Sequence, residues 1–115
     1  MSYNMIWNIN GDDCLAIKVA TTLLDGCVLG LLDQNDMYGY ELTKRVQESI
    51  DVSNSTMYPV MRRLKSDGLV DTYDESFEGR NRRYYRITDD GVDHLDSVRK
   101  EWQNFKNGID QLMGE

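Results

Sequence analysis

The chain has 115 residues, enough for one domain with its own hydrophobic core, and a formal net charge of −7 at pH 7. Its 40% of hydrophobic and 29% of charged residues exclude a disordered or low-complexity protein. No apolar run reaches the ~20 residues of a membrane span, and the first residues lack the basic and apolar parts of a signal peptide. We therefore expect a globular protein of the cytoplasm that has no membrane partner.

Basic charge is concentrated in one part of the chain. Residues 44–86 hold nine basic and seven acidic side chains, a net charge of +2, whereas the remainder carries −9. Since phosphates are bound by Lys and Arg, this segregation is compatible with a nucleic-acid partner despite the acidic total.

A first helix is predicted from Asp12 or Asp13 to Leu32, because apolar side chains recur there at steps of three and four residues. Cys14 and Cys27 would then lie about 20 Å apart along one helix, too far for a disulfide. We interpret both as small apolar side chains rather than as redox groups.

The polar segment 33–39, DQNDMYG, is typical of a turn. After it, Leu42, Val46 and Ile50 lie four residues apart, which predicts a shorter second helix.

A third helix is predicted after the capping sequence DVSNST, with Gly68 as its left-handed stop. Pro59 leaves the start of this helix open. With Ser55 as the N-cap the proline ring removes only one hydrogen bond near the first turn, whereas an earlier start implies a kink. The apolar face is predicted to carry Met57, Val60, Met61 and Leu64.

The segments LVDTYDES and RRYYRIT are rich in β-branched and aromatic residues and predict a two-stranded hairpin with a basic tip. Gly79 and Asn81 lie at the turn between them. Tyr85 and Ile87 share the strand face that would cover the core, while Tyr84, Arg86 and Thr88 share the other.

A long last helix is predicted after Thr88, whose hydroxyl suits an N-cap, with Asp89 and Asp90 in the first turn. About 25 residues of helix span about 37 Å and overhang so small a domain, so the apolar stripe needs a second chain unless it folds back on the first helix. The stripe follows heptad spacing and comprises Leu95, Val98, Trp102, Phe105, Ile109 and Leu112.

The order helix, helix, helix, hairpin predicts a mainly α (α+β) fold: a winged helix-turn-helix followed by one long C-terminal helix. We divide the chain into an N-terminal extension (1–11), a DNA-binding domain (12–88) and a dimerisation helix (89–115).

In such a fold the third helix enters the major groove of DNA and the hairpin forms a wing beside it. The basic face of the third helix, Arg62, Arg63 and Lys65, is alternatively a solvated surface, and Tyr58 is alternatively a core residue. Arg86 is alternatively paired with a nearby acid. The predicted DNA contacts are Asn54, Ser55, Thr56, Tyr58, Arg62, Arg63, Arg80, Arg82 and Arg83.

Nothing in the sequence predicts an enzyme, a cofactor or a metal site. The single histidine, His94, has no second histidine or cysteine at metal-ligand spacing, and no phosphate-binding loop or nucleophile elbow is present. We interpret His94 as a surface or interface side chain.

Four segments in this order resemble the PadR-type bacterial transcriptional regulators: YGYEL (38–42), STMYPVMRRLKSDGLV (55–70), GRNRRYYRIT (79–88) and DGVDHL (90–95). The similarity covers about residues 14–105 and points to the smaller subgroup, which has one dimerising helix after the wing.

The resemblance implies a homodimeric repressor of a palindromic DNA operator. It places Ser55, Thr56, Tyr58 and Arg63 on the recognition helix, and Arg80, Arg82 and Arg83 on the wing, near the DNA backbone or minor groove. In some members, aromatic residues of the paired last helices line a pocket for flat apolar compounds.

Trp102 falls where such a tryptophan is found, which predicts a small aromatic ligand bound by Val98, Trp102 and Phe105. The alternative for Trp102 is dimer packing alone. Trp7 does not align, so a part in this pocket is left open. The alternative function is a protein-interaction module, in which the winged domain or the last helix binds another protein and DNA binding is incidental.

Overall fold

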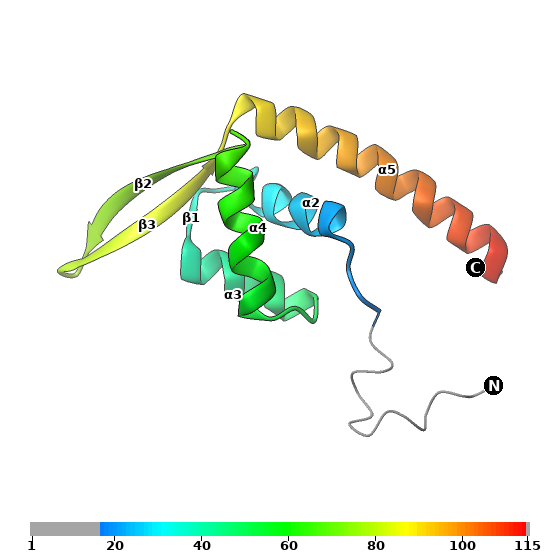
Figure 1. Cartoon of the computed structure of the whole chain (residues 1–115), viewed down its shortest axis with the longest axis horizontal. Coiled ribbons are helices and arrows are strands. Elements are labelled where there is room, and N and C mark those ends of the chain that lie inside the picture. The colour runs from blue at the N-terminus through cyan, green and yellow to red at the C-terminus, as the bar shows by residue number, and fades with distance from the viewer. Residues whose placement is uncertain (1–16, 115) are drawn as a thin grey trace, which may run out of the picture.

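The structure is a computed structural model that describes residues 17–114. It is mainly helical with a small antiparallel sheet, and the predicted winged helix-turn-helix with one C-terminal helix is confirmed (Figure 1). The elements are α2 (Thr21–Leu32), β1 (Met37–Tyr38), α3 (Gly39–Ser49), α4 (Asn54–Ser66), β2 (Val70–Phe77), β3 (Arg80–Ile87) and α5 (Asp89–Met113).

The predicted helix start at Asp12 or Asp13 is wrong for residues 17–20, because α2 begins only at Thr21. Residues 17–20 are not helical, and Ile17 is 89% exposed. The buried face of α2 begins only at Leu24, so the preceding turn has no apolar contacts to stabilise it.

The sequence predicts that Cys14 and Cys27 are too far apart for a disulfide, and Cys14 lies outside the described residues. Cys27 is half-buried, and this burial raises the pKa of its thiol. A thiol with a raised pKa stays protonated near neutral pH, which fits a small apolar side chain better than a redox group.

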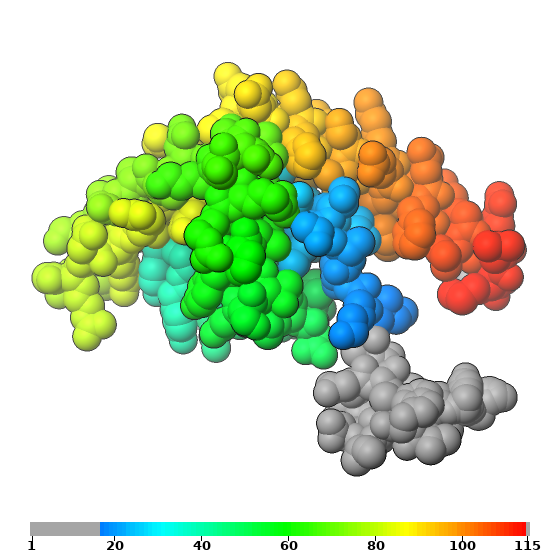
Figure 2. Space-filling model, viewed as in Figure 1, coloured from blue at the N-terminus to red at the C-terminus, as the bar shows by residue number. Residues whose placement is uncertain are grey.

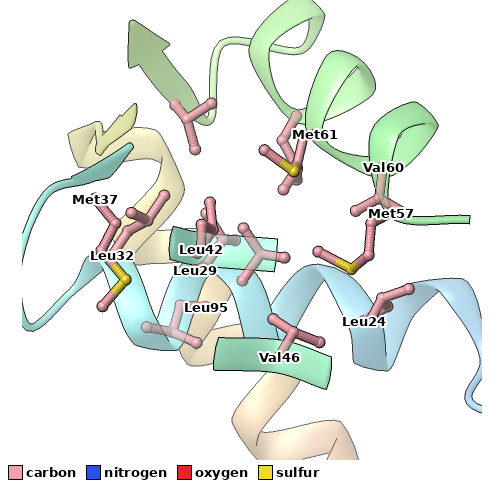
Figure 3. Packing of buried hydrophobic residues seen from close by; sticks show 13 residues of the cluster. Leu24, Leu29, Leu32, Met37, Leu42, Val46, Met57, Val60, Met61 and Leu95 are labelled. Carbon is pink, nitrogen blue, oxygen red and sulfur yellow. The ribbon is translucent and has the colours of Figure 1, made fainter. Parts of the chain in front are cut away.

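The hydrophobic core lies where α2, α3 and α4 meet, with Met37 of β1 and Leu95 of α5 at its side (Figure 3). The apolar periodicity of α3 and α4 predicted their inward faces correctly. The predicted core residues that are buried are Leu42, Val46, Met57, Val60, Met61 and Leu64.

Helix α4 starts earlier than a Ser55 cap would allow. Ser53 is the N-cap, and its hydroxyl accepts a hydrogen bond from the backbone N–H of Thr56 at 3.2 Å. Pro59 therefore lies inside the helix, which continues through it to Ser66. Gly68 has a φ of +76° just beyond the helix, so the predicted left-handed stop is confirmed.

The sheet has three strands in the order β1-β3-β2, one more than the predicted hairpin. Within the expected turn 33–39, Met37 and Tyr38 pair with Tyr85 and Tyr84 of β3. The pairing covers the outer edge of β3 and buries Met37 in the core, which a polar turn pattern does not signal.

The wing turns over two residues, Glu78 and Gly79, which have φ angles of 52° and 78°. Two positive φ angles are the requirement of a type I′ turn, and glycine adopts such an angle without strain. Asn81, predicted in the turn, instead lies in β3 opposite Ser76. Tyr85 and Ile87 pack against the core as predicted.

Helix α5 begins as predicted. The Thr88 hydroxyl accepts from the Gly91 N–H at 3.0 Å and donates to the Gly68 carbonyl at 2.7 Å. The first half of α5 packs on α2, where Leu95 and Val98 are buried. A Cβ added at Gly26 would meet Val98 Cγ1 at 2.6 Å, so the two helices approach closely.

The six-residue stripe of α5 is therefore not one uncovered surface. Its first two members are buried within the chain by folding back on the preceding helix, and only the later ones remain open. Trp102 is 40% exposed, Phe105 59% and Leu112 85%. Figure 2 shows the last turns of α5, in red, projecting beyond the winged domain.

Within residues 17–114, no helix combines the length and the apolar character needed to span a membrane.

Gly91 fixes the distance between α5 and the start of the wing, and its substitution by alanine should destabilise the fold. The new Cβ would clash with the Leu69 carbonyl oxygen and with Ile87 Cγ1 at 2.7 Å, and the backbone oxygen cannot rotate away. We expect Gly91→Ala to lower the free energy of unfolding by about 2 kcal/mol. Urea denaturation followed by circular dichroism, at one fixed protein concentration, measures this.

The control is Gly108→Ala in the same helix, where the Cβ meets nothing within 4 Å. Its better helix propensity should raise stability by up to about 1 kcal/mol. Equal stabilities of the two variants would contradict the close packing of α5 on residues 69 and 87.

Candidate nucleic-acid interface

The start of α4 presents a row of exposed polar side chains held by their own hydrogen bonds. Ser53 Oγ lies 2.9 Å from Ser55 Oγ and donates to Thr56 Oγ1 at 3.2 Å. Gln47 of α3 donates to Asn54 Oδ1 at 2.8 Å and to the Val52 carbonyl at 3.1 Å. These bonds orient the residues predicted to meet DNA before any DNA is present.

Tyr58 is about half exposed, so of its two predicted roles the structure favours the surface one. It lies one turn after Asn54 on α4 and can therefore reach the same surface as the polar N-terminal residues.

Arg63, predicted as a DNA contact, is partly exposed and is bound by Asp25 of α2. Its Nη2 lies 2.6 Å from Asp25 Oδ1 of α2, and its Nη1 donates to Asp25 Oδ2 at 3.2 Å. The hydrogen bond to Asp25 raises the pKa of Arg63. Asp25 is only 5% exposed, and a buried carboxylate needs a charged partner. By pairing with Asp25, Arg63 therefore holds α4 against α2.

His94 of α5 also approaches this pair. Its Nε2 lies 4.0 Å from Asp25 Oδ2, so the Asp25 carboxylate is approached from α4 and from α5. The His94 side chain is 39% exposed and partly covered at this junction, which agrees with the predicted surface or interface position.

A groove runs between α4 and the wing, and both of its walls carry basic side chains. Arg62 and Lys65 are exposed on α4, and Arg83 comes from β3. Arg83 Nε lies 3.1 Å from Asp74 Oδ1. This hydrogen bond lowers the pKa of Asp74 and raises that of Arg83. The groove is lined by Met61, Arg62, Lys65, Ser66, Thr72, Arg83 and Tyr85.

Arg82, the neighbour of Arg83, lies on the opposite face of the strand. Its guanidinium carbon is 4.2 Å from the centre of the Tyr38 ring and 4.1 Å from that of Phe77. Arg80 is exposed at the tip of the wing, and no carboxylate of residues 17–114 forms an ion pair with it.

Arg86 lies over the ring of Tyr73, 5.0 Å from its centre. The Tyr73 hydroxyl donates to Asp36 Oδ2 at 2.6 Å, and this bond raises the pKa of Tyr73 to about 12. Within residues 17–114 Arg86 forms no ion pair with an acid, which was the alternative predicted for it; it contacts the Tyr73 ring instead.

The three residues predicted to bind a flat ligand do not share one environment. Trp102 and Phe105 are exposed neighbours with ring centres 6.3 Å apart, whereas Val98 is buried against Gly26. Val98 is therefore not available to a ligand in this structure. Trp7, like the rest of the predicted N-terminal extension, lies outside the described residues.

In the part of the chain that the structure describes, no three potential metal ligands cluster. What the described residues bring together is a polar helix start, a groove with basic walls and a wing that carries four arginines. A recognition helix with a wing beside it defines the winged helix-turn-helix class of DNA-binding proteins.

The chain belongs to the Transcriptional regulator PadR-like family, whose profile matches residues 28–97. The solved structure of smu.1704 from Streptococcus mutans UA159 is similar, with a TM-score of 0.80 and 32% identity over 85% of this chain and 92% of that one. A PadR family transcription regulator from Clostridium difficile R20291 has a TM-score of 0.72 and 31% identity, covering 78% and 97%.

The transcriptional regulator Rv3488 of Mycobacterium tuberculosis is 38% identical over 76 residues, which are 65% of this chain and 71% of that protein. The predicted family is thus confirmed, and this protein is a PadR-family transcriptional regulator of the DNA-binding kind. The assignment to the smaller subgroup stays a prediction.

Sequence reasoning missed Asp25, Tyr38 and Phe77. A signal existed for Asp25, because a charged residue inside an apolar helical stripe must find a partner. For Tyr38 and Phe77 the aromatic residues were visible, but their meeting with Arg82 depends on a strand pairing that local patterns do not give.

The Asp25–Arg63 pair yields a stability prediction. Arg63→Ala should lower the free energy of unfolding by about 2 kcal/mol, because it leaves a buried carboxylate unpaired while Arg63 itself is partly exposed. Urea denaturation measures the change. The adjacent, exposed Arg62→Ala serves as the control and should stay within about 0.5 kcal/mol of the wild type.

Asp25→Leu combined with Arg63→Met should recover most of the loss, since no charge is then left buried. A loss of the same size for Arg62→Ala and Arg63→Ala would argue against a structural role of the pair.

Proposed function

We propose that the protein binds a palindromic DNA operator as a homodimer and represses transcription, with release by a flat apolar compound. The observation that carries this proposal is the placement of two surfaces at opposite sides of one chain. Figure 1 shows the wing and the end of α5 at opposite sides of the molecule. The groove with basic walls lies beside the wing, and exposed apolar side chains lie at the end of α5.

For the DNA contacts, the proposal keeps Asn54, Ser55, Thr56 and Tyr58 as candidates for reading bases or binding phosphates from α4. Arg62, Lys65, Arg80 and Arg83 then supply attraction to phosphates. Arg63 is no longer a proposed DNA contact, because it donates both of its hydrogen bonds to Asp25. The net charge of the remaining surface is negative, which would confine DNA to this side of the molecule.

For the dimer, the open part of the α5 stripe is the proposed interface. Aromatic and aliphatic side chains repeat along one face of the helix, and within residues 17–114 Trp102, Phe105 and Leu112 stay exposed. The residues of this interface are Trp102, Phe105, Ile109, Leu112 and Met113.

A symmetric dimer would present two copies of α4 to half-sites about 10 bp apart, or a multiple of that distance. A flat compound stacked on Trp102 and Phe105 would change the spacing of the two copies only if it binds one spacing better than the other. Repression rather than activation follows from the family resemblance alone.

The first test is DNA binding to the region upstream of the gene at ~150 mM salt, measured by fluorescence anisotropy. We expect the operator to bind at least ~10³-fold more tightly than competitor DNA. Arg62→Ala and Lys65→Ala should each reduce the slope of log affinity against log salt by about 0.9, because each removes one phosphate contact.

The control is Arg99→Ala, which removes an exposed charge of α5 next to Asp33 and Asp96, away from the groove. Its salt slope should equal that of the wild type. Equal affinity for operator and competitor would reject sequence-specific regulation and favour the alternative of a protein-interaction module.

The second test concerns the dimer. Phe105→Glu should weaken self-association roughly 100-fold, because it places a charge in the apolar interface. The fold of the monomer should not change, because Phe105 is already exposed there. Sedimentation velocity at micromolar protein gives the oligomeric state. Gln103→Glu adds the same charge beside the stripe and should remain dimeric; a dimer that persists in Phe105→Glu would move the interface elsewhere.

A further inference from the structure

The face of the wing that points away from α4 carries a set of stacked side chains. Arg82 lies between the rings of Tyr38 and Phe77, about 4 Å from each centre. The Tyr38 and Tyr84 rings are 5.8 Å apart, and Tyr84 stacks on Tyr73 at 5.5 Å with an angle of 13° between the ring planes. We call Tyr38, Tyr73, Phe77, Arg82 and Tyr84 the Arg82 stack.

The Arg82 stack adds side-chain contacts between two parts of the fold, the β1–α3 corner and the β2–β3 hairpin. Tyr38 belongs to β1 and directly precedes α3, whereas the other members belong to the β2–β3 hairpin. The backbone link between these parts is only the two-residue pairing of β1 with β3. The hydrogen bond from Tyr73 to Asp36 adds a second side-chain link at the same corner.

Two observations separate Arg82 from its neighbour Arg83. Arg83 faces α4 and lines the groove, while Arg82 projects from the other side of the strand. The Arg82 guanidinium carbon lies 4.2 Å and 4.1 Å from the centres of two rings, a cation–π arrangement in which a guanidinium is favoured over an ammonium group. A phosphate bound by the N–H groups of Arg82 would lie on this face of the wing, away from the groove that Arg83 lines.

We propose that Arg82 is a positioning residue, which holds the wing at a fixed angle to the β1–α3 corner by stacking between Tyr38 and Phe77, and is not a phosphate contact. The proposal rests on the proposed function, because the wing must be held in order to meet DNA beside α4. It corrects the predicted role of Arg82. Arg83 stays as the proposed phosphate contact on the groove face, and Arg80, which shares the strand face of Arg82 but is exposed at the tip, stays as a proposed contact of the tip.

The test compares charge with planarity. Arg82→Lys keeps the charge and loses the planar stack, and Arg82→Met loses both. We expect each to weaken operator binding about fivefold with an unchanged salt slope. If Arg82→Lys binds like the wild type, or if Arg82→Met lowers the salt slope by about 0.9, Arg82 is a phosphate contact and the proposal is overturned.

Arg83 is the matched control on the opposite strand face. Arg83→Met should lower the salt slope by about 0.9.

A coupling measurement tests the stack itself. Phe77→Leu alone should weaken operator binding about as much as Arg82→Met, again without a change of salt slope. In the Arg82→Met background, Phe77→Leu should have little further effect, because the contact it removes is already gone. Independent, multiplying effects of the two substitutions would overturn the stacked arrangement.

A measurement without DNA keeps this inference separate from the proposed function. Backbone ¹⁵N relaxation of residues 75–82 should show greater mobility in Arg82→Met and in Phe77→Leu than in the wild type or Arg83→Met. Unchanged relaxation overturns the positioning role even if DNA binds. If the wild type binds no operator while the relaxation changes as expected, the proposed function fails and the positioning of the wing stands.

Discussion

The bidentate pair of Asp25 and Arg63 is the interaction on which the arrangement of the helices depends. A carboxylate buried at 5% exposure is stable only beside its counter-charge, so α4 must present Arg63 at one place along α2. Helix α5 also packs closely on α2, where Val98 lies against Gly26. The recognition helix and the C-terminal helix are thus positioned by two faces of the same helix, and His94 at 4.0 Å completes the junction.

The arginines of this protein divide into groups that their spacing in the sequence conceals. Arg62 and Arg63 are adjacent, yet Arg62 is exposed at the groove and Arg63 is paired with Asp25 of α2. Arg82 and Arg83 are adjacent as well, and they lie on opposite faces of β3 because successive strand residues alternate. A count of basic residues therefore overstates the charge that faces DNA, and the ions released on binding should number fewer than the basic residues of segment 44–86.

Local patterns predicted what local physics decides: the buried faces of α3 and α4, the hairpin, and the Thr88 cap with the acidic first turn of α5. They failed where the outcome depends on distant partners. The start of α2 was placed too early because helix formers continue upstream of the last core contact, and β1 was missed because two residues carry no periodicity. Leu95 and Val98 fit a heptad, but α2 lies close enough to cover them first. In the candidate site, the polar start of α4 and the position of the wing followed from the sequence, whereas the partners of Arg63 and Arg82 did not.

The two-residue turn at Glu78 and Gly79 has a consequence for how this wing can vary. Both φ angles are positive, so the turn fixes the register of β2 against β3. Because Tyr85 and Ile87 anchor the base of β3 in the core, a single residue inserted between Arg83 and Tyr84 would exchange the two faces of the strand's tip, sending Arg83 to the aromatic side and Arg82 toward α4. Relatives that keep both the stack and the groove should therefore differ in wing length by even numbers of residues, a parity rule imposed by the strand itself.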